Sequence, residues 1–146
     1  MNRTSTDSTF GDLETVDLAT IASGLGRSAI HLVPVGDTRR WAYVIQDDRY
    51  EAIVIAWPSG TGLGMHDHNG SAAAVHVVNG RLRERYLDTD GRMKIRWLSE
   101  GETIELSSIH VHEVMNLDDA EVVSVHVYSP PLSDDSFRVD REIDIS

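Results

Sequence analysis

Residues 62–80 read GLGMHDHNGSAAAVHVVNG and contain two histidines, His66 and His68, with one residue between them. In an extended strand, side chains at positions i and i+2 point to the same face, so both imidazoles can reach one metal ion. The stretch ends in Asn79-Gly80, a pair that favours a tight hairpin turn. An HxH pair alone is also compatible with structural or exposed histidines, so the metal interpretation depends on further ligands elsewhere in the chain.

On both sides of this stretch, short apolar runs alternate with turn residues. The runs cover residues 29–35, 40–46, 50–57, 72–78, 81–87, 92–98, 103–106, 109–115 and 121–128. Many short strands with frequent turns are typical of a β-sandwich or a small barrel. One helix is expected over residues 12–22, where Asp12 can cap the start and Gly24 or Gly26 can end it. We therefore predict an all-β fold with a short N-terminal helix.

Composition and charge limit the kinds of function that the chain is expected to have. The chain has 146 residues, enough for one domain, which we place at residues 12–146 after a disordered polar tail at 1–11. With 24 acidic against 13 basic residues, the formal net charge is −11, which argues against non-specific binding of nucleic acid. No apolar run is long enough to predict a membrane span, and the polar start is unlike a secretory signal. The absence of cysteine excludes disulfides and fits a reducing cytoplasm.

Two later segments supply groups that could complete a site around the histidine pair. His112 lies among apolar residues in the run 109–115, and a closed barrel can bring a third histidine from a distant strand into the same interior. Three imidazoles suit iron, zinc, copper or nickel. Near the C-terminal end, alternate residues of one strand are polar and share a face: Ser124, His126 and Tyr128. They predict either a hydrogen-bonded relay ending in a tyrosine hydroxyl or a solvent-facing strand edge.

Four blocks in this order resemble the cysteine dioxygenase type I (thiol dioxygenase) family of the cupin superfamily. They are HDH at 66–68, Gly80 twelve residues further on, SIHVHEVMN at 108–116 and SVHVYSPP at 124–131. The last block is the most specific, whereas HxH alone marks only a cupin. The resemblance covers roughly residues 40–137 and implies a cupin-type β-barrel, or jelly roll.

The resemblance also implies the roles of individual residues. It implies a mononuclear non-haem Fe(II) bound by His66, His68 and His112, and a Ser124–His126–Tyr128 triad beside it. The family's substrate-binding arginine falls on Arg40, which lies 17 residues before Trp57. A guanidinium can bind a substrate carboxylate through two parallel hydrogen bonds. Because Arg39 is adjacent, a shift of one residue in strand register would turn that arginine inward instead.

One position departs from the wider pattern. Ala73 stands where most cupins have a glutamate ligand and where the animal enzymes have a cysteine that crosslinks to the tyrosine. Tyr128 therefore cannot carry that crosslink, and the chain resembles the bacterial form of the family. Three neutral imidazoles would leave the charge of Fe(II) uncompensated, which favours binding of an anionic thiolate.

These features lead to three functional hypotheses. The leading one is oxidation of L-cysteine by O2 to cysteine sulfinic acid, with a small thiol and O2 as the only partners. The second is the same chemistry on 3-mercaptopropionate or another small thiol acid. Arg40 favours cysteine, because family members that act on 3-mercaptopropionate tend to have glutamine there. The third is a metal-binding cupin without catalysis, although such a module has no evident need for the Tyr128 relay.

His110 and a row of basic residues can each be interpreted in more than one way. His110 shares the face of His112, so it is either a rival ligand or a group that contacts a ligand. We prefer His112, which fits the family spacing to Asn116. Alternate basic residues on one predicted strand, Arg92, Lys94 and Arg96, are interpreted as a solvated face balanced by the many acidic residues.

Overall fold

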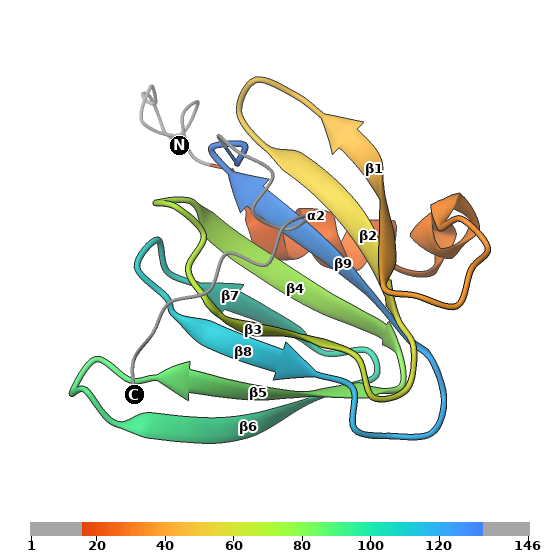
Figure 1. Ribbon diagram of the computed structural model, residues 1–146. Coiled ribbons are helices and arrows are strands. Elements are labelled where there is room, and N and C mark those ends of the chain that lie inside the picture. The colour runs from red at the N-terminus through yellow and green to blue at the C-terminus, as the bar shows by residue number, and fades with distance from the viewer. Residues whose placement is uncertain (1–15, 133–146) are drawn as a thin grey trace.

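The computed structural model describes residues 16–132, and strands make up nearly half of this part of the chain (Figure 1). A helix, α2 (Leu18–Leu25), leads into a 3₁₀ helix, η1 (Gly26–Leu32). The strands follow in chain order: β1 (Arg40–Gln46), β2 (Glu51–Trp57), β3 (Gly62–His66), β4 (Ala72–Asn79), β5 (Arg81–Leu87), β6 (Met93–Ser99), β7 (Thr103–Leu106), β8 (His112–Met115) and β9 (Val122–Ser129). None of the helices in residues 16–132 is long and apolar enough to span a membrane.

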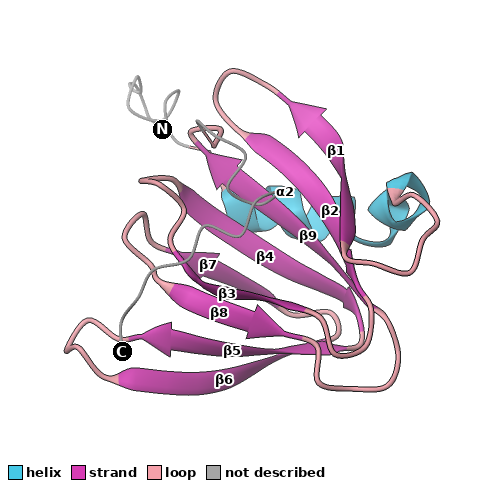
Figure 2. Ribbon diagram, in the orientation of Figure 1, coloured by secondary structure: helices cyan, strands magenta, loops and turns pink. Residues whose placement is uncertain are grey.

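The strands form two antiparallel sheets that pack face to face. One sheet has the order β1-β2-β9-β4-β7 and the other the order β3-β8-β5-β6. Figure 2 shows the smaller sheet facing one side of the larger sheet, while α2 covers the other side across β9, β4 and β7. This arrangement confirms the predicted all-β jelly roll with a short helix at its N-terminal side.

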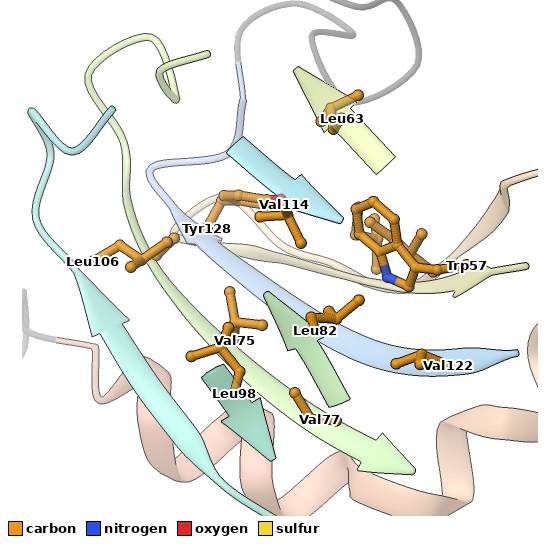
Figure 3. Packing of buried hydrophobic residues seen from close by; sticks show 13 residues of the cluster. Trp57, Leu63, Val75, Val77, Leu82, Leu98, Leu106, Val114, Val122 and Tyr128 are labelled. Carbon is orange, nitrogen blue, oxygen red and sulfur yellow. The ribbon is translucent and has the colours of Figure 1, made fainter. Parts of the chain in front are cut away.

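The main core lies between the sheets (Figure 3). Trp57 and Val75 of the larger sheet meet Leu63, Leu82 and Val114 of the smaller one, and all are at most 5% exposed. A second buried cluster lies between the larger sheet and the helices, so β2 and β9 are buried on both faces. Burial on both faces explains why residues 52–57 form a continuous apolar run instead of a strict alternation.

The N-terminal elements differ from the sequence-based expectation. The helix that the structure describes begins after Asp17, whose carboxylate accepts a hydrogen bond from the amide of Thr20 at 3.1 Å, while the predicted cap Asp12 lies outside the described residues. The run 29–35, predicted as a strand, begins in the 3₁₀ helix, where Ala29 and Ile30 pack on the outer cluster of the larger sheet. Tertiary packing of these apolar side chains therefore outweighs their strand-like pattern. The predicted tail at 1–11 lies outside the described residues.

A β-bulge in β1 changes which of its side chains face the core. Tyr43 pairs with Ile53 of β2, but Ile45 pairs with Ala52, so Val44 is an extra residue on β1. Beyond the bulge, Trp41 stands opposite Ile55 on the inner face, while Arg40 stands opposite Ala56 on the outer face. The extra residue thus reverses the facing of every β1 side chain N-terminal to it.

Candidate metal centre and adjoining polar groups

Three histidines from two neighbouring strands of the smaller sheet converge in the interior. His66 ends β3, His68 follows it by two residues, and His112 begins β8 directly opposite His66. Their ring centroids lie 4.7–5.2 Å apart, and each offers a nitrogen within 4.8 Å of the others. The structure therefore brings together the three residues predicted as ligands, at a spacing at which a single ion can contact all three.

The cavity at this point is small, with a free volume of about 20 Å³. Its wall combines the histidines with Tyr128 and with apolar side chains: Ile55, Trp57, Leu63, Val114 and Leu132.

Hydrogen bonds fix the orientation of two of the three rings. Nδ1 of His66 donates to the carbonyl oxygen of Gly64 at 2.7 Å, and Nδ1 of His112 donates to Glu84 at 2.6 Å. Each of these neutral rings therefore keeps an unprotonated Nε2. Nδ1 of His68 is buried and has no hydrogen-bond partner among the described residues. A buried imidazole nitrogen without a partner is costly unless a ligand satisfies it, so the donor set fits a metal ion.

Burial keeps these histidines neutral. Loss of hydration, reinforced by the neighbouring His112, lowers the pKa of His66 to about 3 and that of His68 to about 2. Burial also lowers the pKa of His112, although the carboxylate of Glu84 opposes the shift. All three therefore present lone pairs at neutral pH, the protonation state that metal binding requires.

A buried carboxylate that the sequence interpretation missed lies behind His112. Glu84 of β5 is fully buried, and its Oε2 accepts hydrogen bonds from His110 Nε2 at 2.7 Å and His112 Nδ1 at 2.6 Å. Burial opposes its ionisation, but these bonds and one from Arg96 outweigh it and hold the pKa of Glu84 well below its usual range. No carboxylate belongs to the three-histidine cluster of the described residues, but Glu84 places a negative charge beyond the ring of His112 that the sequence-based expectation did not include.

The sequence held a signal for this carboxylate. Along β5, three arginines on one face alternate with Leu82, Glu84 and Tyr86 on the other, so Glu84 is the one acid on an otherwise apolar face. The sequence left His110 as either a rival ligand or a group that contacts a ligand. In the structure it contacts Glu84 and is not part of the cluster formed by His66, His68 and His112.

Ser124, His126 and Tyr128 form a buried hydrogen-bonded line on β9. Trp57 Nε1 donates to Ser124 Oγ at 2.8 Å, and Ser124 Oγ lies 2.7 Å from His126 Nε2. On the other side of the ring, His126 Nδ1 lies 3.4 Å from the hydroxyl of Tyr128. Because β9 is a central strand and all three residues are buried, the alternative of a solvent-facing strand edge is wrong.

The protons along this line can be assigned from the donors. Because Trp57 already donates to Ser124, the serine hydroxyl has its own proton to give to Nε2 of His126. Burial lowers the pKa of His126 to about 3, so the ring is neutral and carries its single proton on Nδ1, facing Tyr128. Burial, with a contribution from Glu51, raises the pKa of Tyr128, so its hydroxyl stays protonated. The hydroxyl oxygen of Tyr128 therefore accepts a hydrogen bond from His126 Nδ1–H. Its own O–H remains able to donate a hydrogen bond to a group bound in the cavity.

The predicted place of Arg40 in the site is corrected by the β1 bulge. Arg40 lies on the outer face, where its guanidinium binds both carboxylate oxygens of Glu121 at 3.0 and 3.2 Å. Arg39 lies on the inner face with its guanidinium carbon 5.7 Å from the ring centroid of Trp57. Burial is the main cause of the lowered pKa values of His66 and His126, and the positive charge of Arg39 adds to it; the same charge opposes the rise in the pKa of Tyr128. The inward-facing arginine is therefore Arg39.

Ala73, at the position where related sequences carry glutamate or cysteine, stands directly opposite Tyr128 in the β4–β9 pair. It is 2% exposed and belongs to the main core. A cysteine at this point would lie beside the tyrosine, but this sequence has none, so Tyr128 cannot form a crosslink to cysteine.

Comparison with solved structures identifies the fold. TT1209 from Thermus thermophilus aligns with a TM-score of 0.58 and 18% identity over 66% of this chain and 88% of its own. A Klebsiella pneumoniae protein with a double-stranded beta-helix domain aligns with a TM-score of 0.56 and 18% identity over 66% of this chain and 81% of its own. At this identity the likeness shows the fold, the double-stranded β-helix of the cupins.

Sequence comparison is more specific. The chain is 31% identical to cysteine dioxygenase type 1 of Danio rerio over 93 residues and 29% identical to that of Rattus norvegicus over 92 residues. These alignments cover 57% of this chain and 46% of each relative, so the chain spans about half the length of the relatives that it matches. The model of the family "Cysteine dioxygenase type I" matches residues 34–140, which include all three clustered histidines and the whole of β9. The chain therefore belongs to the cysteine dioxygenase type I family.

Proposed function

We propose that this protein is an iron-dependent thiol dioxygenase that converts L-cysteine and O2 to cysteine sulfinic acid. The observation that carries the proposal is the convergence of three buried, neutral imidazoles and the hydroxyl of Tyr128 on one small cavity. The family supports a thiol dioxygenase, and the donor set supports a transition metal.

His66, His68 and His112 would hold the ion. An all-imidazole donor set also suits zinc, copper or nickel, and iron is proposed because the reaction consumes O2. When bound, iron(II) supplies redox chemistry toward O2 and lowers the pKa of a thiol at the site.

The remaining groups bind and orient the substrate. We assign Arg39 to the substrate carboxylate, because it is the arginine on the inner face and because its charge acts on the cavity residues. The apolar side chains of Leu63, Val114 and Leu132 provide a dry wall for the methylene group between carboxylate and sulfur. The small cavity favours a short thiol over a peptide.

The reaction adds both atoms of O2 to one sulfur: R–SH + O2 → R–SO2H. Four electrons leave the sulfur and reduce the four-electron oxidant, so no further reductant is needed. We assign to the hydroxyl of Tyr128, which lies 3.4 Å from His126 Nδ1, the role of donating a hydrogen bond to negative charge that develops on oxygen. The line from Trp57 through Ser124 fixes the tautomer of His126 and thereby the direction of this donor.

The test is turnover by the whole protein. Protein loaded anaerobically with Fe(II) receives L-cysteine or, separately, 3-mercaptopropionate, and then O2; oxygen uptake and the sulfinate product are measured. We expect one sulfinate per O2 with cysteine as the better substrate. His112→Gln should abolish turnover. The matched control is His76→Gln, which should not; His76 lies on β4 and is hydrogen-bonded to Thr103 of β7.

Each outcome decides between the hypotheses. Iron binding without O2 uptake for any small thiol would replace the enzyme with a metal-binding module. Faster turnover of 3-mercaptopropionate than of cysteine would keep the chemistry and change the substrate.

A further inference from the structure

Glu84 occupies an unusual place between the strand that carries His112 and the edge of the smaller sheet. In register, it stands opposite Val114 of β8 on one side and Arg96 of β6 on the other. Its side chain is fully buried. A buried carboxylate is costly unless donors satisfy it, so its partners need to be accounted for.

Three donors satisfy this carboxylate. Oε2 accepts from His112 Nδ1 at 2.6 Å and from His110 Nε2 at 2.7 Å, while Oε1 accepts from Nε of Arg96. Hydrogen bonds to both oxygens fix the position of the Glu84 carboxylate. Nδ1 of His112 therefore donates to an acceptor that is held in place. Because His112 is neutral, the proton given to Glu84 leaves Nε2 unprotonated and directed toward the other two histidines.

Arg96 is itself held in place, and its positive charge partly neutralises the negative charge of Glu84. Its guanidinium carbon lies 4.7 Å from the ring centroid of Tyr86, and that ring stacks on His110 at 5.5 Å. The side chain of Arg96 is about one-third exposed, so its charge reaches Glu84 from the rim of the sheet. Glu84 and Arg96 therefore act on a dication at the histidines with opposite signs.

Another interpretation is a second metal site. Glu84, His110 and His112 offer ligand atoms within 4.8 Å of one another. The guanidinium of Arg96 already occupies one carboxylate oxygen, and its positive charge opposes a cation there. The geometry therefore favours a support for the first site over a second ion.

We propose that Glu84 is a positioning residue for the metal centre, which fixes the metal-binding tautomer of His112 and strengthens metal binding through its negative charge, whereas Arg96 weakens binding by partly neutralising that charge. This inference rests on the three-histidine site of the proposed function, but not on the oxidation of a thiol.

The test titrates metal-free protein with Co(II) and follows the visible absorption of the bound ion, with a competing chelator to obtain the dissociation constant. Glu84→Gln keeps the shape and removes the charge, and we expect it to weaken binding about 10- to 100-fold. Arg96→Gln should strengthen binding, by about threefold or more. Glu113→Gln is the matched control: this residue neighbours His112 but binds Arg83 and Arg85, and its variant should bind Co(II) like the unaltered protein.

The opposite signs separate this role from a purely structural one. If Glu84 only stabilised the fold, Glu84→Gln and Arg96→Gln would weaken binding together, and that result would overturn the proposal. So would unchanged binding in Glu84→Gln, or two Co(II) ions per chain. Should Glu84→Gln not fold, Arg96→Gln alone decides by the direction of its change. If the unaltered protein bound Co(II) with the expected pattern among the variants but, loaded with Fe(II), oxidised no thiol, the proposed function would be refuted and this inference would still hold.

Discussion

Exchanging either of two neighbouring arginines for glutamine tests whether the β1 bulge selects the substrate-binding residue. Arg39→Gln removes a guanidinium from the inner face, and Arg40→Gln removes one that is bound to Glu121 on the outer face. The two variants have the same change in charge and adjacent positions in one strand, so they differ mainly in the face that each alters.

The expected magnitude follows from the pairing geometry. A bidentate, charge-assisted pair between arginine and a carboxylate in a largely dry cavity contributes about 3 kcal/mol, which is about a 100-fold change in an equilibrium constant. Because the carboxylate does not change during oxidation of the sulfur, the loss should fall on binding of substrate and transition state alike. Arg39→Gln should therefore raise KM for cysteine about 100-fold with little change in kcat.

Arg40→Gln should leave KM unchanged. Its partner Glu121 is partly exposed, so loss of the ion pair should change the free energy of unfolding by less than about 1 kcal/mol. The assay is initial-rate O2 uptake over a range of cysteine concentrations, with thermal unfolding to check that both variants fold. A raised KM in Arg40→Gln with a normal KM in Arg39→Gln would refute the assignment and the consequence drawn from the bulge.

Further perturbations address the line on β9 and the buried histidines. Tyr128→Phe should lower kcat about 100-fold while Co(II) binding is kept, and Tyr50→Phe, which packs against the outer cluster, serves as its control. Trp57→Phe removes the donor to Ser124 and should cost about 1–3 kcal/mol in denaturant unfolding; an unchanged midpoint would contradict the bond. The pKa values of His66, His68 and His126 are lowered from 6.5 to about 3, 2 and 3, so below pH 6.5 the unfolded chain binds protons that the folded metal-free protein does not. Stability of the metal-free protein should therefore fall as the pH drops from about 6.5 toward 3, by up to about 1.4 kcal/mol per pH unit for each histidine; a flat pH profile of unfolding would contradict their burial as neutral rings.

The parts of the site that the sequence predicts correctly are those set by local periodicity. His66 and His68 share a face because they alternate along an extended segment, and the same period aligns Ser124 with Tyr128. Such features need no knowledge of which strands become neighbours.

The features that the sequence does not reveal depend on pairing between strands. The ungapped count of 17 residues from Trp57 indicates Arg40, but one extra residue in β1 shifts the register and turns Arg39 inward. Nothing in the composition near Val44 marks this bulge, because its cause is the fit of β1 to β2. In the same way, Arg96 belongs to a run that is predicted to be solvated, yet β5 places the buried Glu84 opposite it, and its guanidinium binds that carboxylate while the side chain stays about one-third exposed.

The charges around the cavity indicate what kind of molecule this protein can hold there. The chain has a net charge of −11, so its overall field repels an anion, and binding requires positive charge close at hand. The three imidazoles are neutral, and the negative charge of Glu84 is offset by Arg96, so these five groups contribute little net charge. A divalent ion and Arg39 would then leave two separate positive centres, one at the histidines and one near Trp57. A small molecule that carries two anionic groups, a thiolate and a carboxylate, matches both centres at once, whereas a simple thiol satisfies only the first. The same reasoning predicts that cysteamine, which has the thiol and the amine of cysteine but no carboxylate, should be a poor substrate whose KM is the same in Arg39→Gln and in the unaltered protein.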